Sequence, residues 1–127
     1  MGYLYDKELV AEIVEQIISA MTSAQKRCQY AKSPDDFIET ETGQEKLDFV
    51  CMKLIATGES LKKIDHITER TLLEKYPDVE WKKIKGIRDF LSHHYFDLDA
   101  DVIFDICQDH IDTLLITLKK IHADLIS

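Results

Sequence analysis

The stretch that decides the fold class is LVAEIVEQIISAM, residues 9–21. Its apolar residues recur three and four positions apart, at 9, 10, 13, 14, 17, 18 and 21. That spacing places them on one face of an α-helix, which we expect to run from about Asp6 to Ala31. No segment alternates apolar and polar residues for long enough to predict a sheet. The sequence therefore predicts an all-α protein.

Working outward, Ser33-Pro34-Asp35-Asp36 has the capping-box residues and the early proline that end the first helix and begin a short turn. A second capping box, Thr42-x-x-Glu45, opens the next helix. Gly58 lies in the middle of that helix, where glycine costs about 1 kcal/mol relative to alanine. We therefore expect Gly58 to mark a kink or a close approach between two helices.

Weaker helical periodicity covers residues 65–75 and ends at Tyr76-Pro77. Asp78 can cap a further helix from Val79 to about His94, and Asp99 can cap a last one. The last helix turns a continuous stripe inward: Ile103, Ile106, Cys107, Ile111, Leu114, Leu118, Ile121 and Leu125. Short connections between such helices predict an antiparallel four- to five-helix bundle, a single domain over residues 1–127.

Composition limits the kind of partner. The chain is 45% hydrophobic and 31% charged, as ordinary soluble proteins are. Its net charge of −8 disfavours broad wrapping of nucleic acid, so any RNA contact must come from a local basic patch. No apolar run approaches the ~18 residues of a membrane span. The N-terminus has no secretory signal, and Asp6 stands where a myristoylation signal needs Ser or Thr. We expect a cytoplasmic protein without a membrane contact.

Three cysteines, Cys28, Cys51 and Cys107, are widely spaced and form no C-x-x-C pair. An odd number without metal-ligand spacing predicts reduced structural thiols in a reducing compartment, and neither a zinc site nor a disulfide framework. The five histidines form no metal-binding motif, and no glycine-rich nucleotide loop occurs. We expect no metal and no cofactor.

Arg88-Asp89-Phe90-Leu91-Ser92-His93-His94-Tyr95 gathers most of the reactive side chains. On a heptad grid Arg88 falls on the seam that faces another helix, where a guanidinium needs an acidic partner or access to solvent. It is either the partner of an acidic residue such as Glu59 or a functional cation. His93 follows five residues later, about 140° around and roughly 7.5 Å along the helix, so the two converge only near the helix end or across a dimer interface.

Supporting residues surround this pair. Asp89 shares a helix face with His93 and can orient its imidazole. We expect His94 to be a packed or hydrogen-bonded core histidine rather than a catalytic one. Tyr95, considered alone, is a core aromatic with its hydroxyl at the surface. Three lysines give the helix a basic flank, which is either a solvated face or a contact for an anionic polymer: Lys82, Lys83 and Lys85.

The segment from Tyr76 to Phe96, with its Pro, Trp, Gly-x-Arg-Asp step and Arg-x4-His-x-Tyr motif, closely resembles the HepT-like branch of the HEPN superfamily. Gly58-Glu59-Ser60 matches that branch's Gly-Glu-Ala step, with Ser in place of Ala. The resemblance implies a HEPN-like helical bundle that forms a homodimer, with the motif lining a cleft at the interface. It also implies a metal-independent endoribonuclease, the toxin of a toxin–antitoxin pair.

The resemblance assigns roles residue by residue. Arg88 would hold the scissile phosphate, and His93 would act as general acid or base. Asp89 occupies the polar position often found after the arginine. Apart from the resemblance, we take Asp89 and His94 as supporting residues and Lys82, Lys83 and Lys85 as candidate substrate contacts. The implied partner is a minimal nucleotidyltransferase antitoxin that transfers AMP to Tyr95. Two alternatives stay open: a non-catalytic HEPN module that binds a nucleotidyltransferase or a nucleotide, and a structural bundle in which Arg88 only pairs with Glu59.

Overall fold

The computed structural model describes residues 4–127, without the side chain of Tyr95. Gly2, considered above for lipidation, lies outside the described residues. Five α-helices make up most of the chain, and residues 4–127 contain no strand. The helices are α1 Lys7–Cys28, α2 Glu41–Ile67, α3 Trp81–His94, α4 Ala100–Asp109 and α5 Ile111–Ile126. Short 3₁₀ turns connect them: η1 Pro34–Phe37, η2 Leu73–Lys75 and η3 Tyr95–Asp97. The prediction of an all-α bundle of four to five helices is confirmed.

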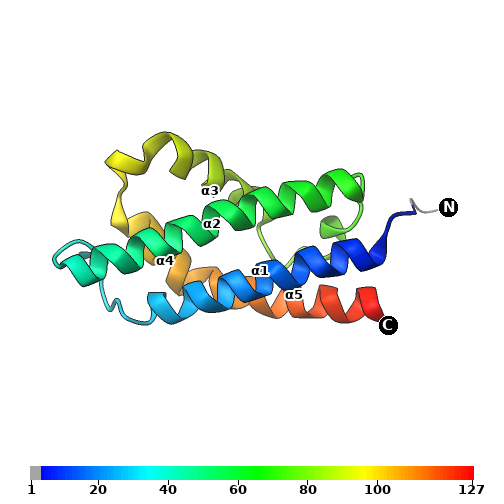
Figure 1. The fold of residues 1–127 in the computed structure, drawn as a ribbon, viewed down its shortest axis with the longest axis horizontal. Helices are drawn as coiled ribbons and strands as arrows, with labels where there is room; N and C mark the ends of the chain where they lie inside the picture. The colour runs from blue at the N-terminus through cyan, green and yellow to red at the C-terminus, as the bar shows by residue number, and fades with distance from the viewer. Residues whose placement is uncertain (1–3) are drawn as a thin grey trace.

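Long helices that pack against each other, α1 with α2 and α1 with α5, run antiparallel (Figure 1). α2 packs between α1 and α3, and α5 packs along the other side of α1. The described N-terminal end and the C-terminus lie at the same end of the bundle (Figure 1). Helix α3 therefore has α2 on one side and an outward surface on the other, which places its polar residues within reach of a ligand.

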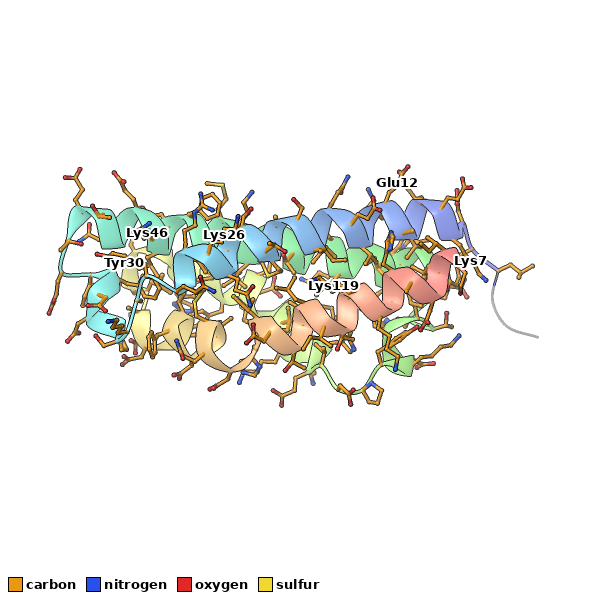
Figure 2. All side chains as sticks on the ribbon, turned by 90° about the horizontal axis from the view of Figure 1, so that it is seen from below. Lys7, Glu12, Lys26, Tyr30, Lys46 and Lys119 are labelled. Carbon is orange, nitrogen blue, oxygen red and sulfur yellow. A yellow bond between two sulfur atoms is a disulfide. The ribbon has the colours of Figure 1, made fainter. Side chains whose placement is uncertain are left out.

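Helix α1 forms as its apolar stripe predicts. Val10, Val14, Ile17 and Met21 are buried in the core between the helices. The carboxylate of Asp6 caps the helix by accepting the Leu9 N–H at 3.1 Å. The helix ends at Cys28, three residues before the predicted end, where the chain turns toward η1. Figure 2 shows the end of this helix, where Lys46 of α2 approaches the ring of Tyr30 at 5.2 Å.

The predicted capping box at Ser33 is present, with Asp36 accepting from the Ser33 backbone N–H at 3.3 Å. The second predicted cap is wrong by two residues. Thr40, not Thr42, caps α2, because Thr40 has the extended backbone that a cap needs (φ −130°, ψ 156°) and accepts the Gly43 N–H at 3.0 Å. Thr42 lies inside the first turn of the helix.

The predicted last helix is two helices, α4 and α5, separated at His110. Asp99 caps α4 as predicted, accepting the Asp101 N–H at 2.9 Å. The break was invisible to periodicity because Cys107 and Ile111 are four residues apart, so the apolar stripe continues across it. His110 has a backbone outside the helical range (φ −121°, ψ −31°), and this bend lets α4 and α5 follow different directions.

Cys28 and Cys107 form a disulfide that spans 79 residues, so the prediction of three reduced thiols is wrong for two of them. Separation along the sequence says nothing about proximity once α4 crosses the end of α1, and the two Cα atoms are 5.5 Å apart. Cys51 is the remaining free thiol of the described chain and is buried, which raises its pKa to about 12. The cysteines therefore give no argument for a reducing compartment. None of the helices in residues 4–127 is both long and apolar enough to cross a membrane.

Candidate functional site

Helix α3 presents one apolar face to the core and one polar face outward. Its buried residues are Trp81, Ile84, Ile87 and Leu91. The helix begins at Trp81, two residues later than predicted, where the indole N–H donates to the Tyr76 carbonyl at 2.9 Å. Arg88 lies at the boundary of the two faces, and 33% of its side chain remains exposed. The predicted position on a packing seam with access to solvent is confirmed.

Gly58 of α2 makes room for Arg88. A Cβ added at Gly58 would lie 2.6 Å from the Arg88 Cβ, closer than two such atoms approach in proteins. The glycine therefore allows α2 and α3 to meet at this point, which is the close approach that the sequence predicted. The backbone of Arg88 is fixed by helix packing, while its guanidinium extends past α2 toward solvent.

Two carboxylates hold the guanidinium. The Arg88 Nε group pairs with Glu59 of α2, and Nη1 donates to the Asp89 Oδ1 at 2.9 Å. Hydrogen bonds to Asp89 and then Glu59 raise the pKa of Arg88 further above its ordinary value. The ion pair with Glu59 exists, yet Arg88 and Glu59 are 33% and 51% exposed, and pairs so open to water add little to stability. Its main effect is to fix where the guanidinium points.

Asp89 joins α3 to α2 as well. Its carboxylate accepts from Lys62 Nζ at 3.2 and 3.3 Å. The hydrogen bond from Arg88, followed by that from Lys62, lowers the pKa of the Asp89 carboxyl. Asp89 is therefore an anion that balances two cations at the surface of the site.

His93 is oriented by Asp89, as predicted, and the contact is made by the backbone carbonyl of Asp89. Its Nδ1 lies 2.7 Å from the backbone carbonyl oxygen of Asp89, whereas the Asp89 carboxylate is engaged by Arg88 and Lys62. A carbonyl oxygen only accepts, so Nδ1 must carry the proton. In the neutral ring this leaves Nε2 as the acceptor. The His93 side chain is exposed, so that nitrogen is available to a ligand.

His94 is exposed and its ring lies against that of Phe90, with centroids 5.1 Å apart and the two planes tilted by 36°. The expectation of a packed core histidine is wrong, because His94 is the last residue of α3 and projects beyond the apolar face that Leu91 completes. Tyr95 begins η3 directly afterwards. The side chain of Tyr95, the predicted modification site, lies outside the described part of the structure.

The three predicted basic residues have different surroundings. Lys85 forms an ion pair with Asp65 of α2. Lys82 is exposed and lines a groove between α2 and α3, whereas the exposed Lys83 does not line it. The lysines are therefore not one continuous patch, and only Lys82 and Lys85 face the same cavity.

This α2–α3 groove has a volume of about 730 Å³ and lies between the C-terminal half of α2 and the first turns of α3. His66 and Gly86 lie in its wall, and its charged lining residues are Lys62, Arg70, Lys82, Lys85, Asp65 and Asp89. Sequence reasoning missed Lys62, Asp65 and Arg70. A signal for two of them existed, because positions 62 and 65 follow Gly58 by four and seven residues, on the helix face that the glycine brings to α3.

Taken together, α2 and α3 present a guanidinium held by two carboxylates, a histidine with one nitrogen free, and an adjoining groove with basic walls. These groups can bind a phosphate and move a proton. In residues 4–127, no three His, Cys, Asp or Glu side chains gather closely enough to hold a metal ion. Asp89 links Arg88 to His93, and among the described side chains no direct contact joins these two residues.

Known proteins resemble this chain over most of its length. A family described as "Ribonuclease HepT-like" matches residues 10–121. Relatives from Methanocaldococcus jannaschii include "Putative RNase MJ0127", 29% identical over 72% of this chain and 69% of its own length. "Putative RNase MJ0125" is 33% identical over 59% of this chain and 60% of its own. No solved structure gives a significant match. The matched residues include all of α2 and α3, with the arginine, the histidine and the groove beside them. The chain belongs to the HepT-like ribonuclease family.

Proposed function

We propose that this protein is a metal-independent endoribonuclease that acts in the cytoplasm as the toxin of a toxin–antitoxin module. The observation that carries the proposal is the arrangement around Asp89. Its carboxylate holds the Arg88 guanidinium, and its carbonyl holds His93 with Nε2 free. One residue thus orients both a phosphate-binding cation and a base, which is the pair that RNA cleavage requires. Membership of a ribonuclease family supports the same reading.

In this mechanism Arg88 binds the scissile phosphate. Its guanidinium already lies half-exposed and pre-oriented by Glu59 and Asp89, so little rearrangement is needed before substrate binds. As the phosphorus becomes five-coordinate, negative charge grows on its non-bridging oxygens. A fixed guanidinium therefore stabilises the transition state, where this charge is larger, more than it stabilises the ground state.

His93 moves the proton. Neutral Nε2 accepts the proton of the ribose 2′-hydroxyl, and the 2′ oxygen then forms a bond to phosphorus. The bond from phosphorus to the 5′ oxygen breaks, and that oxygen takes a proton from water. The products are a 2′,3′-cyclic phosphate and a 5′-hydroxyl, and His93 returns to its neutral form by releasing its proton to solvent. The hydrogen bond to the Asp89 carbonyl keeps the reactive tautomer in place throughout.

The predicted partners complete the proposal. A homodimer would bring two copies of α3 together, and the exposed Phe90 and His94 at the end of that helix give it an apolar contact surface. A minimal nucleotidyltransferase antitoxin would transfer AMP to Tyr95, directly after the helix that carries Arg88 and His93. Each AMP adds bulk and negative charge next to a phosphate-binding arginine, and this repels RNA.

The proposed cleavage reaction is tested by changing the RNA rather than the protein. Wild-type protein is incubated with a labelled RNA in EDTA, and with the same RNA carrying one 2′-deoxy nucleotide at the cleaved position. We expect cleavage of the first, with a 2′,3′-cyclic phosphate end, and none at that position in the second. Cleavage that EDTA abolishes, or that persists at the deoxy position, would contradict the mechanism.

The regulatory part needs a separate measurement. Intact mass is recorded for the protein expressed alone and together with a nucleotidyltransferase encoded beside it. We expect a gain in multiples of AMP on co-expression, which Tyr95→Phe abolishes. An unchanged mass in an active pair, or AMP that remains on the Tyr95→Phe variant, would refute the assignment of Tyr95.

A second candidate is a non-catalytic module that binds a nucleotidyltransferase or a nucleotide. The double ion pair of Arg88 favours it, because a cation already neutralised by Glu59 and Asp89 is a poorer phosphate ligand than a free one. This candidate predicts that varied RNAs stay intact while the partner binds. The EDTA assay above distinguishes the two.

A further inference from the structure

The α2–α3 groove carries more positive charge than its surroundings. Four cationic and two anionic side chains line it, in a chain whose net charge is −8. Two of the cations are neutralised locally, since Lys85 pairs with Asp65 and Lys62 pairs with Asp89. The remaining two, Arg70 and Lys82, have no ion-pair partner in the part of the chain that the structure describes.

These two residues come from different elements and lie at the same groove. Lys82 extends from the first turn of α3. Arg70 follows the end of α2, where Glu69 and Arg70 both adopt positive φ values, 50° and 64°. Non-glycine residues seldom adopt that conformation, which costs about 1 kcal/mol or more each. The Arg70 N–H donates to the Asp65 carbonyl at 2.8 Å, and this bond helps to hold the unusual turn that brings the arginine to the groove.

The wall of the groove has open space at Gly86. Gly86 of α3 is exposed, and a Cβ added there would meet nothing within 4 Å. Among the described residues that line the groove there is no Phe, Tyr or Trp. Aromatic side chains are what proteins use to stack single-stranded bases. Among the described residues, the imidazole of His66 is the single ring of the lining on which a base can stack, and such stacking does not select a base sequence. The groove therefore offers mainly contacts for phosphates.

The groove leads directly to the proposed reactive groups. Asp89 forms part of its wall and also accepts the hydrogen bond from Arg88 at 2.9 Å. Lys82 precedes Arg88 by six residues, about 9 Å along an α-helix. Six residues also turn about 120° around the helix, so a strand whose scissile phosphate is held by Arg88 reaches Lys82 by crossing α3 at Asp89, which contacts Arg88 and lines the groove.

We propose that the α2–α3 groove binds the phosphodiester backbone of the RNA strand next to the scissile phosphate, with Arg70 and Lys82 as the phosphate ligands. This rests on the proposed function and adds a second contact region to it. Because the contacts are to phosphates, the region increases affinity without selecting a base sequence. It also accounts for RNA binding by an acidic protein, since the attraction is confined to one groove.

The test measures binding without cleavage. A fluorescent oligonucleotide in 2′-deoxy form is titrated with wild-type protein and with the double variant Arg70→Asn/Lys82→Ala, over a range of salt concentrations. Asn replaces Arg70 because it tolerates positive φ. We expect the double variant to bind at least about tenfold more weakly. Its log–log salt slope should be smaller by about 1.4, or 0.7 for each lost phosphate contact.

The matched control is Lys119→Ala/Lys120→Ala, which removes the same charge from exposed positions on α5. Helix α5 packs against α1, and Figure 2 shows Lys119 on the side away from α3. We expect the control to bind nearly as wild type. The proposal would be overturned if both double variants lost the same affinity for the oligonucleotide, or if the groove variant lost none. ATP is titrated in the same way. If ATP binds wild type as tightly as the oligonucleotide does, and binds the groove variant more weakly, the groove is a site for a free nucleotide and the proposal is overturned.

Cleavage separates this proposal from the one on which it rests. With cleavable RNA we expect the groove variant to lower kcat/KM about tenfold and to leave the rate at saturating RNA unchanged. If wild type cuts RNA and the groove variant binds normally, the groove assignment fails and the ribonuclease assignment stands. If the wild-type protein binds the oligonucleotide through the groove and cuts no RNA, the ribonuclease assignment fails and the groove remains a binding site for a nucleic-acid backbone.

Discussion

At the scale of single residues, Asp89 organises the candidate site. The sequence predicted that it would orient His93, and it does so through its backbone carbonyl oxygen. The carboxylate is drawn to the two cations beside it, Arg88 and Lys62, and the backbone carbonyl is left to accept the imidazole N–H. Sequence spacing identifies which residues share a helix face. Spacing does not predict which of several nearby cations or donors a carboxylate will pair with, because some of them come from another helix.

Gly58 gives the first prediction. Gly58→Ala places a methyl group 2.6 Å from the Arg88 Cβ, so α2 and α3 must move apart. Overpacking typically costs about 1–3 kcal/mol in the free energy of unfolding, and the higher helix propensity of alanine offsets about 1 kcal/mol of it. We therefore expect Gly58→Ala to be about 1–3 kcal/mol less stable than a control that gains the same helix propensity without a clash, together with weaker RNA cleavage as Arg88 shifts. Urea unfolding and a cleavage assay measure the two effects.

The matched control is Gly86→Ala on α3, where the added methyl group meets nothing within 4 Å. Alanine is the better helix former, so this variant should be more stable by about 1 kcal/mol. A Gly58→Ala protein as stable as Gly86→Ala would show that the helices do not meet as closely as described.

Tyr76 gives a prediction for pH. Partial burial, and then the hydrogen bond from its hydroxyl to Asp124 Oδ2 at 2.6 Å, raise the pKa of Tyr76 from 10.0 to about 12. The folded state thus holds this proton more tightly, so the contribution to stability is complete below about pH 10 and is lost as the pH rises through about 12. Tyr76→Phe should cost about 1 kcal/mol at about pH 8.

Urea unfolding at several pH values checks this. The difference between wild type and Tyr76→Phe should shrink steadily on the alkaline side as the wild-type tyrosine ionises. A difference that stays constant up to the pH at which both proteins unfold would mean that the hydroxyl and Asp124 do not stabilise the fold.

At the scale of elements, the helices were predictable and their ends were less so. Leu9 to Met21 carries a full apolar stripe, and α1 forms there because one face can be buried. The ends depend on competition between neighbours, as where Thr40 rather than Thr42 caps α2. After the break at His110, α5 packs along α1, whereas α4 also contacts α2 and η1, and a stripe that continues across the break cannot reveal this difference.

The disulfide joins the end of α1 to α4 and gives a prediction at this scale. Closing a loop of 79 residues should stabilise the fold by about 2–4 kcal/mol, so a reductant should lower the melting temperature. Calorimetry with and without reductant measures the change. Thiol titration of the unfolded protein should find one free group before reduction, that of Cys51, and three afterwards.

The variant Cys28→Ser/Cys107→Ser is the control, because its melting temperature should not respond to reductant. A wild-type protein with three titratable thiols before reduction would contradict the disulfide. An intact disulfide whose reduction leaves the melting temperature unchanged would instead contradict its effect on stability.

At the scale of the whole molecule, the fold decides what the motif can do. Arg88 and His93 could be named from the sequence, since both lie in one short segment of α3. The groove could not be identified in the same way. It needs the C-terminal half of α2 to lie beside the first turns of α3, and Arg70 reaches it only through a turn with positive φ. Residues far apart in the sequence meet there only after the bundle has formed (Figure 1).

The measurement that tests the account most directly is the single-turnover rate of RNA cleavage in EDTA by wild type, Arg88→Ala and His93→Ala. The protein is held in excess over RNA, and circular dichroism shows that each variant keeps its helices. Removing a phosphate-stabilising cation or a general base typically costs about 10²–10⁴ in rate. The account predicts losses in that range for both variants. Cleavage at the wild-type rate by both folded variants would contradict it, because the activity would then lie elsewhere on the molecule or in another protein.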